Sequence, residues 1–161
     1  MISRRLGPSD APAWKTFRLS MLADVPEAFC ALHDDLADKP VEFFADWLSR
    51  FHCFVVEDAT GFVGSAAWKP NGSPVTRHRG EVSAVYVRPD ARGKGVLDML
   101  LQAVEADAKG QVILLELEVN ARLTPALRAY KRNGWEVLAR LPAHMKHGDV
   151  LSDAWRMVKR L

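Results

Sequence analysis

The sequence predicts a single α/β domain, and three observations support this fold class. The chain has 161 residues, 48% of them hydrophobic, and no Pro/Gly/Ser-rich stretch divides it. Residues 81–119 follow the order strand, helix, strand, which predicts two parallel strands joined by a right-handed crossover. Residues 52–69 contain two strand-like segments separated by a short turn, which predicts an antiparallel hairpin. We therefore expect one domain over residues 1–161.

The charge balance excludes some partners. Twenty-two Lys and Arg residues face 20 Asp and Glu residues, for a net charge of +2, which does not favour nucleic acid. The N-terminal residues lack an apolar signal region, and no uncharged apolar stretch is long enough to span a bilayer. We expect a soluble cytoplasmic protein with no nucleic-acid and no membrane partner.

The cysteines and histidines do not indicate a metal site. Cys30 and Cys53 form no Cys-x-x-Cys pair and lie within apolar patterns, so we expect both in the core. His144 and His147 are three residues apart, as metal ligands can be, but lie in a predicted loop with only Asp149 close in sequence. We expect no metal.

The first third of the chain predicts a short strand over residues 2–6 and then three helices. Ser9 or Asp10 caps the first helix, Pro26 begins the second and Pro40 the third. The apolar residues at spacings of three and four are Trp14, Phe17 and Met21, then Phe29, Leu32 and Leu36, then Phe44, Trp47 and Phe51. Aromatic residues at this spacing could line a pocket but are more typical of a core.

The predicted hairpin pairs residues 52–57 with residues 61–69, and residues 70–74 form a loop. A basic cluster, Arg77, His78 and Arg79, precedes a strand over residues 81–87. This cluster could contact a phosphate or an acidic ligand, although a solvated loop is the more ordinary interpretation.

A glycine-containing basic turn follows that strand. Pro89 stops strand pairing, and Gly93 and Gly95 allow backbone conformations that a side chain would block. Unpaired amides at the start of the next helix, beside Arg92 and Lys94, suit a phosphate or pyrophosphate. The same pattern can also be a simple chain reversal. It matches neither the P-loop nor the dinucleotide-binding motif.

The rest of the chain predicts two more helices and three more strands. An amphipathic helix ends at Gly110, and a strand over residues 112–119 follows. Thr124 and Pro125 begin a helix that ends at Asn133 and Gly134. Residues 135–141 form a strand, residues 142–149 a loop, and residues 154–159 the last strand. The basic turn then lies at the C-terminal end of a parallel strand, where α/β sheets bind ligands.

These residues resemble a known family. The segment from Val85 to Gly95, with Arg92-Gly93-Lys94-Gly95, resembles the acetyl-CoA pyrophosphate motif of the GNAT N-acetyltransferases. Residues 115–119 and 126–135, with Tyr130 four residues before Gly134 and Trp135, are similar to the family's fifth strand and fourth helix. Residues 17–29 are similar to the opening of one large bacterial branch.

The resemblance implies a mostly antiparallel seven-stranded sheet, flanked by helices, whose parallel fourth and fifth strands splay apart. It implies acetyl-CoA as the acetyl donor and a primary amine, in a small molecule or a peptide, as the acceptor. Transfer would be direct, within a ternary complex. Homodimers are common in the family, which makes a homodimer possible but leaves the oligomeric state open.

The resemblance also implies roles for individual residues. Tyr130 is the candidate for general acid, with a half-buried packing tyrosine as the alternative. The acceptor amine must also lose a proton, and Glu81, or as a weaker candidate Glu116, could take it directly or through water; each could instead be a solvated carboxylate at a strand edge. Backbone groups of Val85, Tyr86 and Val87 would pair with the pantetheine. The residues expected around the pyrophosphate are Arg92, Gly93, Lys94, Gly95, Val96 and Leu97.

Two residues depart from the family pattern. Leu97 stands where a Gly or Ala is usual, and Leu123 stands where an Asn is common; Asn120 is three residues earlier. These departures bear on cofactor affinity, and they leave open a degenerate module that binds CoA without transferring an acetyl group. A nucleic-acid binder that uses the basic turn is a weaker alternative.

Overall fold

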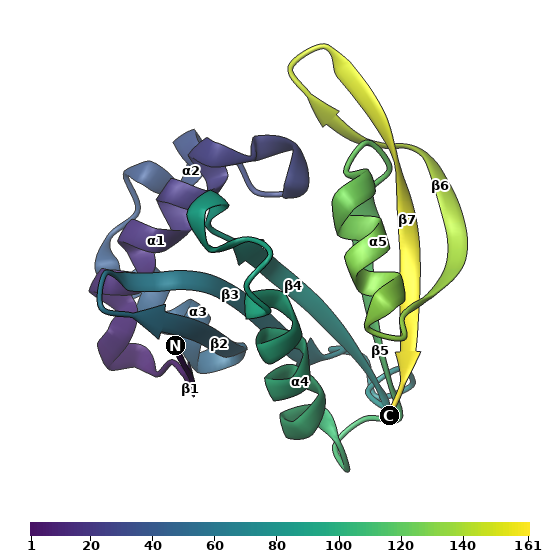
Figure 1. Ribbon diagram of the computed structural model, residues 1–161, viewed down its shortest axis with the longest axis horizontal. Helices are drawn as coiled ribbons and strands as arrows, with labels where there is room; N and C mark the ends of the chain where they lie inside the picture. The colour runs from purple at the N-terminus through teal and green to yellow at the C-terminus, as the bar shows by residue number, and fades with distance from the viewer.

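The computed structural model describes residues 1–161, and its strands form one seven-stranded sheet. Helices cover both faces of this mixed sheet (Figure 1). The strand order is β1-β2-β3-β4-β5-β7-β6. Only β4 and β5 are parallel, and every other neighbouring pair is antiparallel. This topology confirms the expected fold class. The strands are β1 Ile2–Arg5, β2 His52–Asp58, β3 Gly61–Pro70, β4 Arg79–Val87, β5 Leu114–Asn120, β6 Glu136–His147 and β7 Val150–Arg160.

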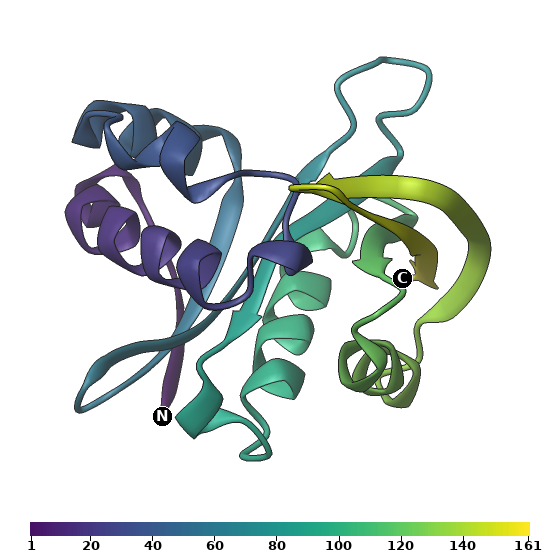
Figure 2. The same cartoon turned by 90° about the horizontal axis from the view of Figure 1, so that it is seen from above.

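Five α-helices and three short 3-10 turns accompany the sheet. Helices α1 and α3 lie together on one side of β2 to β4, and α4 lies on the other side, as the view from above shows (Figure 2). Helix α5 lies beside β5 and β7 (Figure 1). The helices are α1 Ala11–Asp24, α2 His33–Ala37, α3 Val41–Arg50, α4 Val96–Ala108 and α5 Thr124–Arg132, and the turns are η1 Pro8–Asp10, η2 Pro26–Ala28 and η3 Pro89–Ala91. None of these helices has the length and apolar character needed to cross a membrane.

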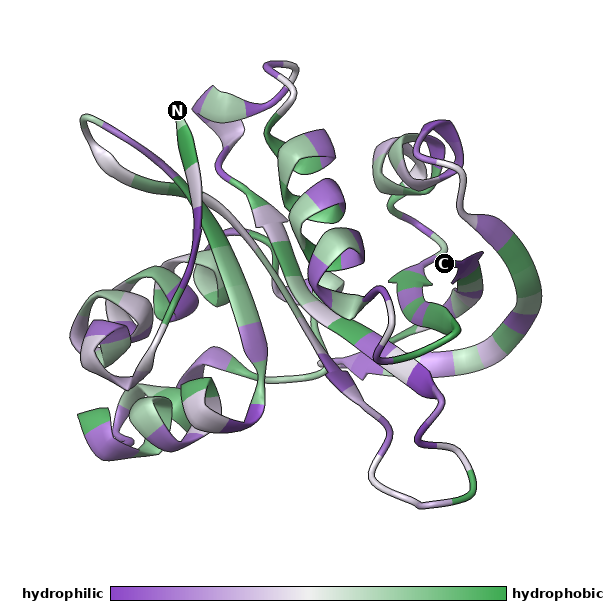
Figure 3. Ribbon diagram, turned by 90° about the horizontal axis from the view of Figure 1, so that it is seen from below, coloured by the Kyte–Doolittle hydropathy of each residue, from purple (hydrophilic) through white to green (hydrophobic).

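Each face of the sheet buries its own hydrophobic cluster. Side chains alternate along β2, so Phe54 and Val56 pack toward α4 while Cys53 and Val55 pack toward α1 and α3. Apolar residues therefore predominate along the central strands, whereas β6, at the sheet edge, mixes polar and apolar residues and is largely exposed (Figure 3). The predicted aromatic core residue Trp14 is buried in the cluster under α1.

The prediction of a helix that begins at Pro26 is wrong. Residues 26–28 form one 3-10 turn, Phe29 is extended, and α2 begins only at His33. Tertiary hydrogen bonds account for the difference, because Asn120 Nδ2 donates to the Glu27 carbonyl (3.0 Å) and His147 Nε2 donates to the Phe29 carbonyl (2.9 Å). These bonds use carbonyl groups that a continuous helix would need for its own turns.

The prediction of a loop over residues 142–149 is also wrong, because β6 continues to His147 and β7 already begins at Val150. The register shifts between Leu141 and Met145, and Ala143 has a positive φ of 47°. The Ala143 amide donates to Asp153 Oδ1 (2.8 Å), which stabilises this irregularity. An irregular strand lacks the simple two-residue alternation that sequence reading depends on.

Gly64 on β3 lets the first turn of α4 lie directly on the sheet. A Cβ atom at this position would lie 2.7 Å from Val96 Cγ1 and 3.0 Å from the Tyr86 carbonyl oxygen. The backbone oxygen belongs to β4 and cannot retreat independently. Gly64 therefore fixes how closely the start of α4 approaches the sheet.

We predict that Gly64→Ala lowers the free energy of unfolding by about 1–3 kcal/mol, because it overpacks the contact between β3 and α4. Urea unfolding monitored by circular dichroism measures the change. Gly72→Ala is the matched control, since a Cβ there meets nothing within 4 Å. Equal midpoints for the Gly64 variant and the wild type would contradict the prediction.

Candidate active site

The parallel strands β4 and β5 are joined only at their beginnings. Their register pairs Arg79, Gly80 and Glu81 with residues 114–116, and then the pairing stops. Beyond this point β5 stays paired with β7 along its whole length, while β4 turns away with β3. The two strands diverge from this point (Figure 1). A cleft of about 700 Å³ lies between them.

A β-bulge in β4 lies in the wall of this cleft. Ala84 and Val85 together face the single residue Ala66 of β3, and Ala84 has a positive φ of 52°. Ser65 Oγ donates a hydrogen bond to the Ala84 carbonyl (2.8 Å), which supports the unusual backbone. A non-glycine residue in this conformation is strained, so the surrounding sheet must hold it in place.

The bulge determines which backbone groups face the cleft. The Arg88 amide donates to the Val63 carbonyl of β3 (2.8 Å), so alternation turns the backbone groups of Val87 and Val85 away from β3, toward the open side. Arg92 Nε donates to the Val87 carbonyl (3.1 Å). The amides of Val85 and Val87 and the Val85 carbonyl are left without a strand partner.

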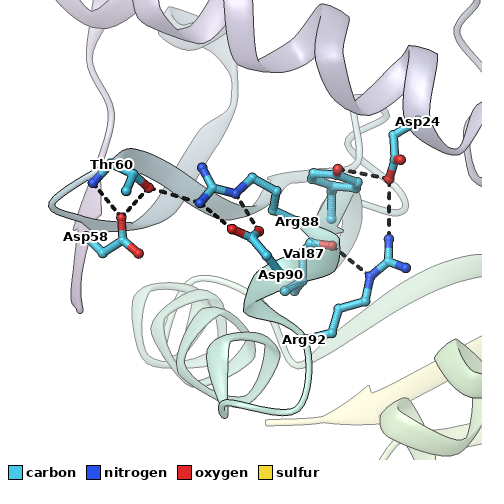
Figure 4. Close-up of polar contacts among 8 residues, drawn as sticks. Asp24, Asp58, Thr60, Val87, Arg88, Asp90 and Arg92 are labelled. Atoms are coloured by element: carbon cyan, nitrogen blue, oxygen red, sulfur yellow. Dashed lines mark hydrogen bonds and ion pairs between the residues drawn. The ribbon is translucent and has the colours of Figure 1, made fainter.

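Tyr86 points in the opposite direction from its two neighbours. Its ring is buried in the cluster under α1, and its hydroxyl donates to Asp24 Oδ2 (3.0 Å), which also lies 3.4 Å from Arg92 Nη2 (Figure 4). Burial, and then the hydrogen bond to Asp24, raise the pKa of Tyr86 to about 12. The Tyr86 side chain therefore ties β4 to α1 and does not line the cleft.

The turn between β4 and α4 holds free amides at its end. Gly93 and Gly95 have φ values of 74° and 78°, and a Cβ at either position would meet nothing within 4 Å. The Met99 amide closes the first helical bond, to the Gly95 carbonyl (3.1 Å), so the preceding amides of the first turn are unpaired. Lys94 is exposed beside them.

Ion pairs hold the approach to this turn. Arg88 Nε donates to Asp90 Oδ1 (2.6 Å), and Arg88 Nη2 donates to Thr60 Oγ1 (2.9 Å) (Figure 4). At the start of α4, Asp98 accepts from Asn133 Nδ2 (2.8 Å) and Arg132 Nη2 (3.1 Å) of the α5 end. The two helices that flank the cleft are thus connected beside the turn.

The two leucines that depart from the family pattern are both placed among apolar side chains. Leu97 is half-buried and packs against the cluster under α4, as does Leu123, which lines the cleft. Asn120 does not replace the missing amide at residue 123. It is buried, and besides its bond to Glu27 its Oδ1 accepts from the Arg122 amide (3.0 Å).

Tyr130 on α5, the candidate general acid, lines the cleft. Only 7% of it is exposed, and its ring lies 6.1 Å from the Trp135 ring. Burial raises the pKa of the Tyr130 hydroxyl, and no charged neighbour opposes this rise. The phenol therefore stays protonated across the neutral range and is a possible proton donor.

Three carboxylates line the cleft, and two of them are neutralised. Arg79 Nε donates to Glu116 Oε2 (3.1 Å), and a second bond joins the same two side chains. Arg156 Nη2 donates to Glu118 Oε1 (2.6 Å), and His144 bonds the other oxygen. Burial alone would raise the pKa of Glu118, but these two hydrogen bonds lower it.

Glu81 is the third carboxylate, and it is exposed at the base of the cleft, where β4 and β5 separate. No hydrogen bond or ion pair holds its side chain. The structure thus brings the predicted residues Tyr130, Glu81 and Val85 to one cleft, while residues 92–97 lie beyond it at the turn. Sequence reasoning missed Glu118, although its alternation with Glu116 along β5 was a usable signal.

The opposite wall comes from α1 and the segment after η2. It includes Arg18, Phe29 and Cys30. The prediction that Cys30 lies in the core is wrong, because its segment is extended rather than helical and leaves it exposed; Cys53 is buried as predicted. Although the residue as a whole is exposed, its sulfur is partly withdrawn from water, and this partial burial, with the nearby Glu118 and Glu81, raises the pKa of the Cys30 thiol.

Comparison with known proteins gives a consistent picture. Residues 19–135 match the model of the acetyltransferase (GNAT) family. An L-methionine sulfoximine/L-methionine sulfone acetyltransferase from Pseudomonas paraeruginosa is 31% identical over 110 residues, which are 67% of this chain and 64% of that protein. The chain thus aligns with less than two thirds of this relative's length.

Solved structures share the whole fold. A ribosomal-protein-alanine N-acetyltransferase from Brucella melitensis superimposes with a TM-score of 0.82 at 25% identity, over 100% of both chains. The protein yncA from Salmonella typhimurium, solved with its cofactor acetyl-CoA, has a TM-score of 0.78 at 21% identity, over 100% of this chain and 94% of that one. Together with the family match over residues 19–135, this confirms the resemblance seen in the sequence: the chain belongs to the acetyltransferase (GNAT) family.

Proposed function

We propose that the protein transfers an acetyl group from acetyl-CoA to a primary amine. The observation that carries this proposal is the edge of β4 beyond Glu81, whose backbone groups face an open cleft and lead to the free amides at the start of α4. Family membership and the acetyl-CoA bound to the Salmonella structure support the choice of donor. The small substrates named for the Pseudomonas relative support a small-molecule amine as acceptor.

The residues present fit acetyl-CoA. Backbone groups of Val85 and Val87 would pair with the amides of its pantetheine arm, as an added strand would. The amides from Gly93 to Leu97 would hold the pyrophosphate, because the helix start offers unpaired N–H groups and favours negative charge. Lys94 and Arg92 would add positive charge, and the inward packing of Leu97 leaves those amides accessible.

Bound acetyl-CoA supplies a thioester, and the residues of the cleft would assist its attack by the amine. Glu81 would accept a proton from the incoming ammonium, directly or through water, and the amine nitrogen would then bond to the acetyl carbon. The Val85 amide would stabilise the negative charge on the acetyl oxygen. As the carbon–sulfur bond breaks, Tyr130 would protonate the leaving thiolate, and the second proton that the nitrogen loses as it becomes an amide would restore the Tyr130 phenol. Both reactants lie in one cleft, so no enzyme nucleophile is needed.

Two measurements test this function. Titration calorimetry with acetyl-CoA should show binding at one site per chain, and a thiol-release assay over a panel of amines should then show turnover. Absence of acetyl-CoA binding would overturn the proposal. Binding without turnover of any amine would favour the degenerate CoA-binding module.

We predict that Tyr130→Phe lowers kcat by about 10²-fold or more and changes the affinity for acetyl-CoA little, because it removes only the proton donated to the thiolate. Steady-state kinetics and calorimetry measure the two quantities. The chain's other tyrosine provides the control: Tyr86→Phe removes a hydroxyl outside the cleft and should keep kcat within a few-fold. Wild-type turnover in Tyr130→Phe would exclude Tyr130 from the mechanism.

We also predict that Glu81→Gln lowers kcat/KM by about 10²-fold at pH 7, because the acceptor then loses its proton less readily. The defect should shrink as pH rises toward the acceptor's own pKa, where solvent has already removed the proton. Profiles of kcat/KM against pH test this, with Glu116→Gln as the control for a carboxylate that Arg79 already neutralises. A defect that is constant with pH would mean that Glu81 is not the base.

A further inference from the structure

Arg18 on α1 stands out among the cations around the cleft. Its guanidinium carbon lies 5.1 Å from the centroid of the Phe29 ring, and its Nη1 is 3.7 Å from Met21 Sδ. Both Arg18 and Phe29 line the cleft. A sulfur atom and an aromatic face are weak partners for a group with five N–H donors.

No carboxylate pairs with Arg18. The arginines on the strands beside the cleft each have a carboxylate partner: Arg79 pairs with Glu116, and Arg156 pairs with Glu118. Burial lowers the pKa of Arg18 to about 10, and the ionisable group that opposes this shift is the Cys53 thiol, whose own pKa burial raises. At neutral pH the guanidinium is therefore charged and the thiol is neutral.

A charged group that is mostly withdrawn from water and left without a counterion is unfavourable. Arg18 Nε and Nη2 have no hydrogen-bond partner, and neither atom is fully buried. Because Arg18 lines the cleft, a ligand bound there could reach these N–H groups. An anion bound in the cleft would supply the counterion that Arg18 lacks. A carboxylate matches the geometry of the guanidinium group.

We propose that Arg18 binds a carboxylate of the acceptor, so that the acceptor is a small zwitterion of the α-amino-acid class. This proposal rests on the proposed function and deepens it. The cleft contains one unpaired cation, Arg18, and one unpaired carboxylate, Glu81, on different walls. An α-amino acid offers the two complementary charges, with its ammonium toward Glu81 and its carboxylate toward Arg18. A peptide N-terminus lacks the adjacent carboxylate.

The test compares amino acids with their amides. L-Methionine sulfone, L-leucine and L-phenylalanine are each assayed against the corresponding α-carboxamide, with wild-type protein, Arg18→Met and Arg18→Lys. Lys15→Met is the matched control, because it removes a positive charge from the same helix outside the cleft. Removing the carboxylate also changes the basicity of the amine, but this effect cancels when the acid-to-amide ratio is compared between variants.

For at least one pair we expect the wild type to prefer the acid by about 10- to 100-fold in kcat/KM, the range for a charged hydrogen-bonded contact. Arg18→Met should abolish the preference, Arg18→Lys should retain part of it, and Lys15→Met should retain all of it. An equal rate for acid and amide in the wild type, or an unchanged ratio in Arg18→Met, would overturn the proposal even if amines are acetylated.

A binding measurement separates this proposal from the proposed function. Calorimetric titration of L-methionine sulfone, L-leucine and L-phenylalanine into each variant saturated with CoA needs no turnover. We expect the affinity of the best-bound acid to fall at least 10-fold in Arg18→Met and to stay unchanged in Lys15→Met. Undetectable binding of every acid to the wild type would overturn the role of Arg18. Urea unfolding should show Arg18→Met at least as stable as the wild type, since the lost charge had no partner.

Discussion

The separation of β4 from β5 is the constraint on which the site depends. A parallel pair normally continues along its hydrogen-bonded edge, but here it ends after three residue pairs. The two strands diverge because β4 follows β3 through the bulge at Ala84, while β5 follows β7, its partner on the opposite edge. Unpaired backbone groups are costly when buried, so an edge left open within a sheet suits a ligand that supplies the missing partners.

The pattern of charge pairing gives the cleft its chemical character. Ion pairs neutralise Glu116 and Glu118, and further contacts fix Arg88 and Arg92 at the turn. Tyr130 and Glu81 line the cleft without a hydrogen-bond partner for their side chains, and Arg18 lines it without a carboxylate partner. Proteins usually satisfy such groups internally, and exceptions gather where a ligand completes the arrangement. The groups without partners therefore indicate which chemical groups the ligand supplies, and the groups that are already paired do not.

Contacts between distant segments explain what sequence reading could and could not predict. The turn from Arg92 to Gly95 and the helix that holds Tyr130 were predictable, because glycine, proline and apolar spacing act within a few residues. The extended segment at Phe29 was not, since its backbone conformation depends on Asn120 and His147, more than 90 residues away in the chain. The same segment exposes Cys30 and covers Arg18, so these features were missed as well.

The sequence alone was enough to predict the element order, the parallel crossover and the glycine turn, and to show the resemblance to the GNAT family. These features depend on conformational preferences and motif spacing among residues close together in the chain. Only the tertiary structure decided that β4 bends at Ala84, that Tyr86 turns away from the cleft, and that Glu116 is neutralised while Glu81 is free. Each of these depends on which strands and side chains meet across the fold. Pairing energies of that kind are a property of the assembled sheet, and no single segment contains them.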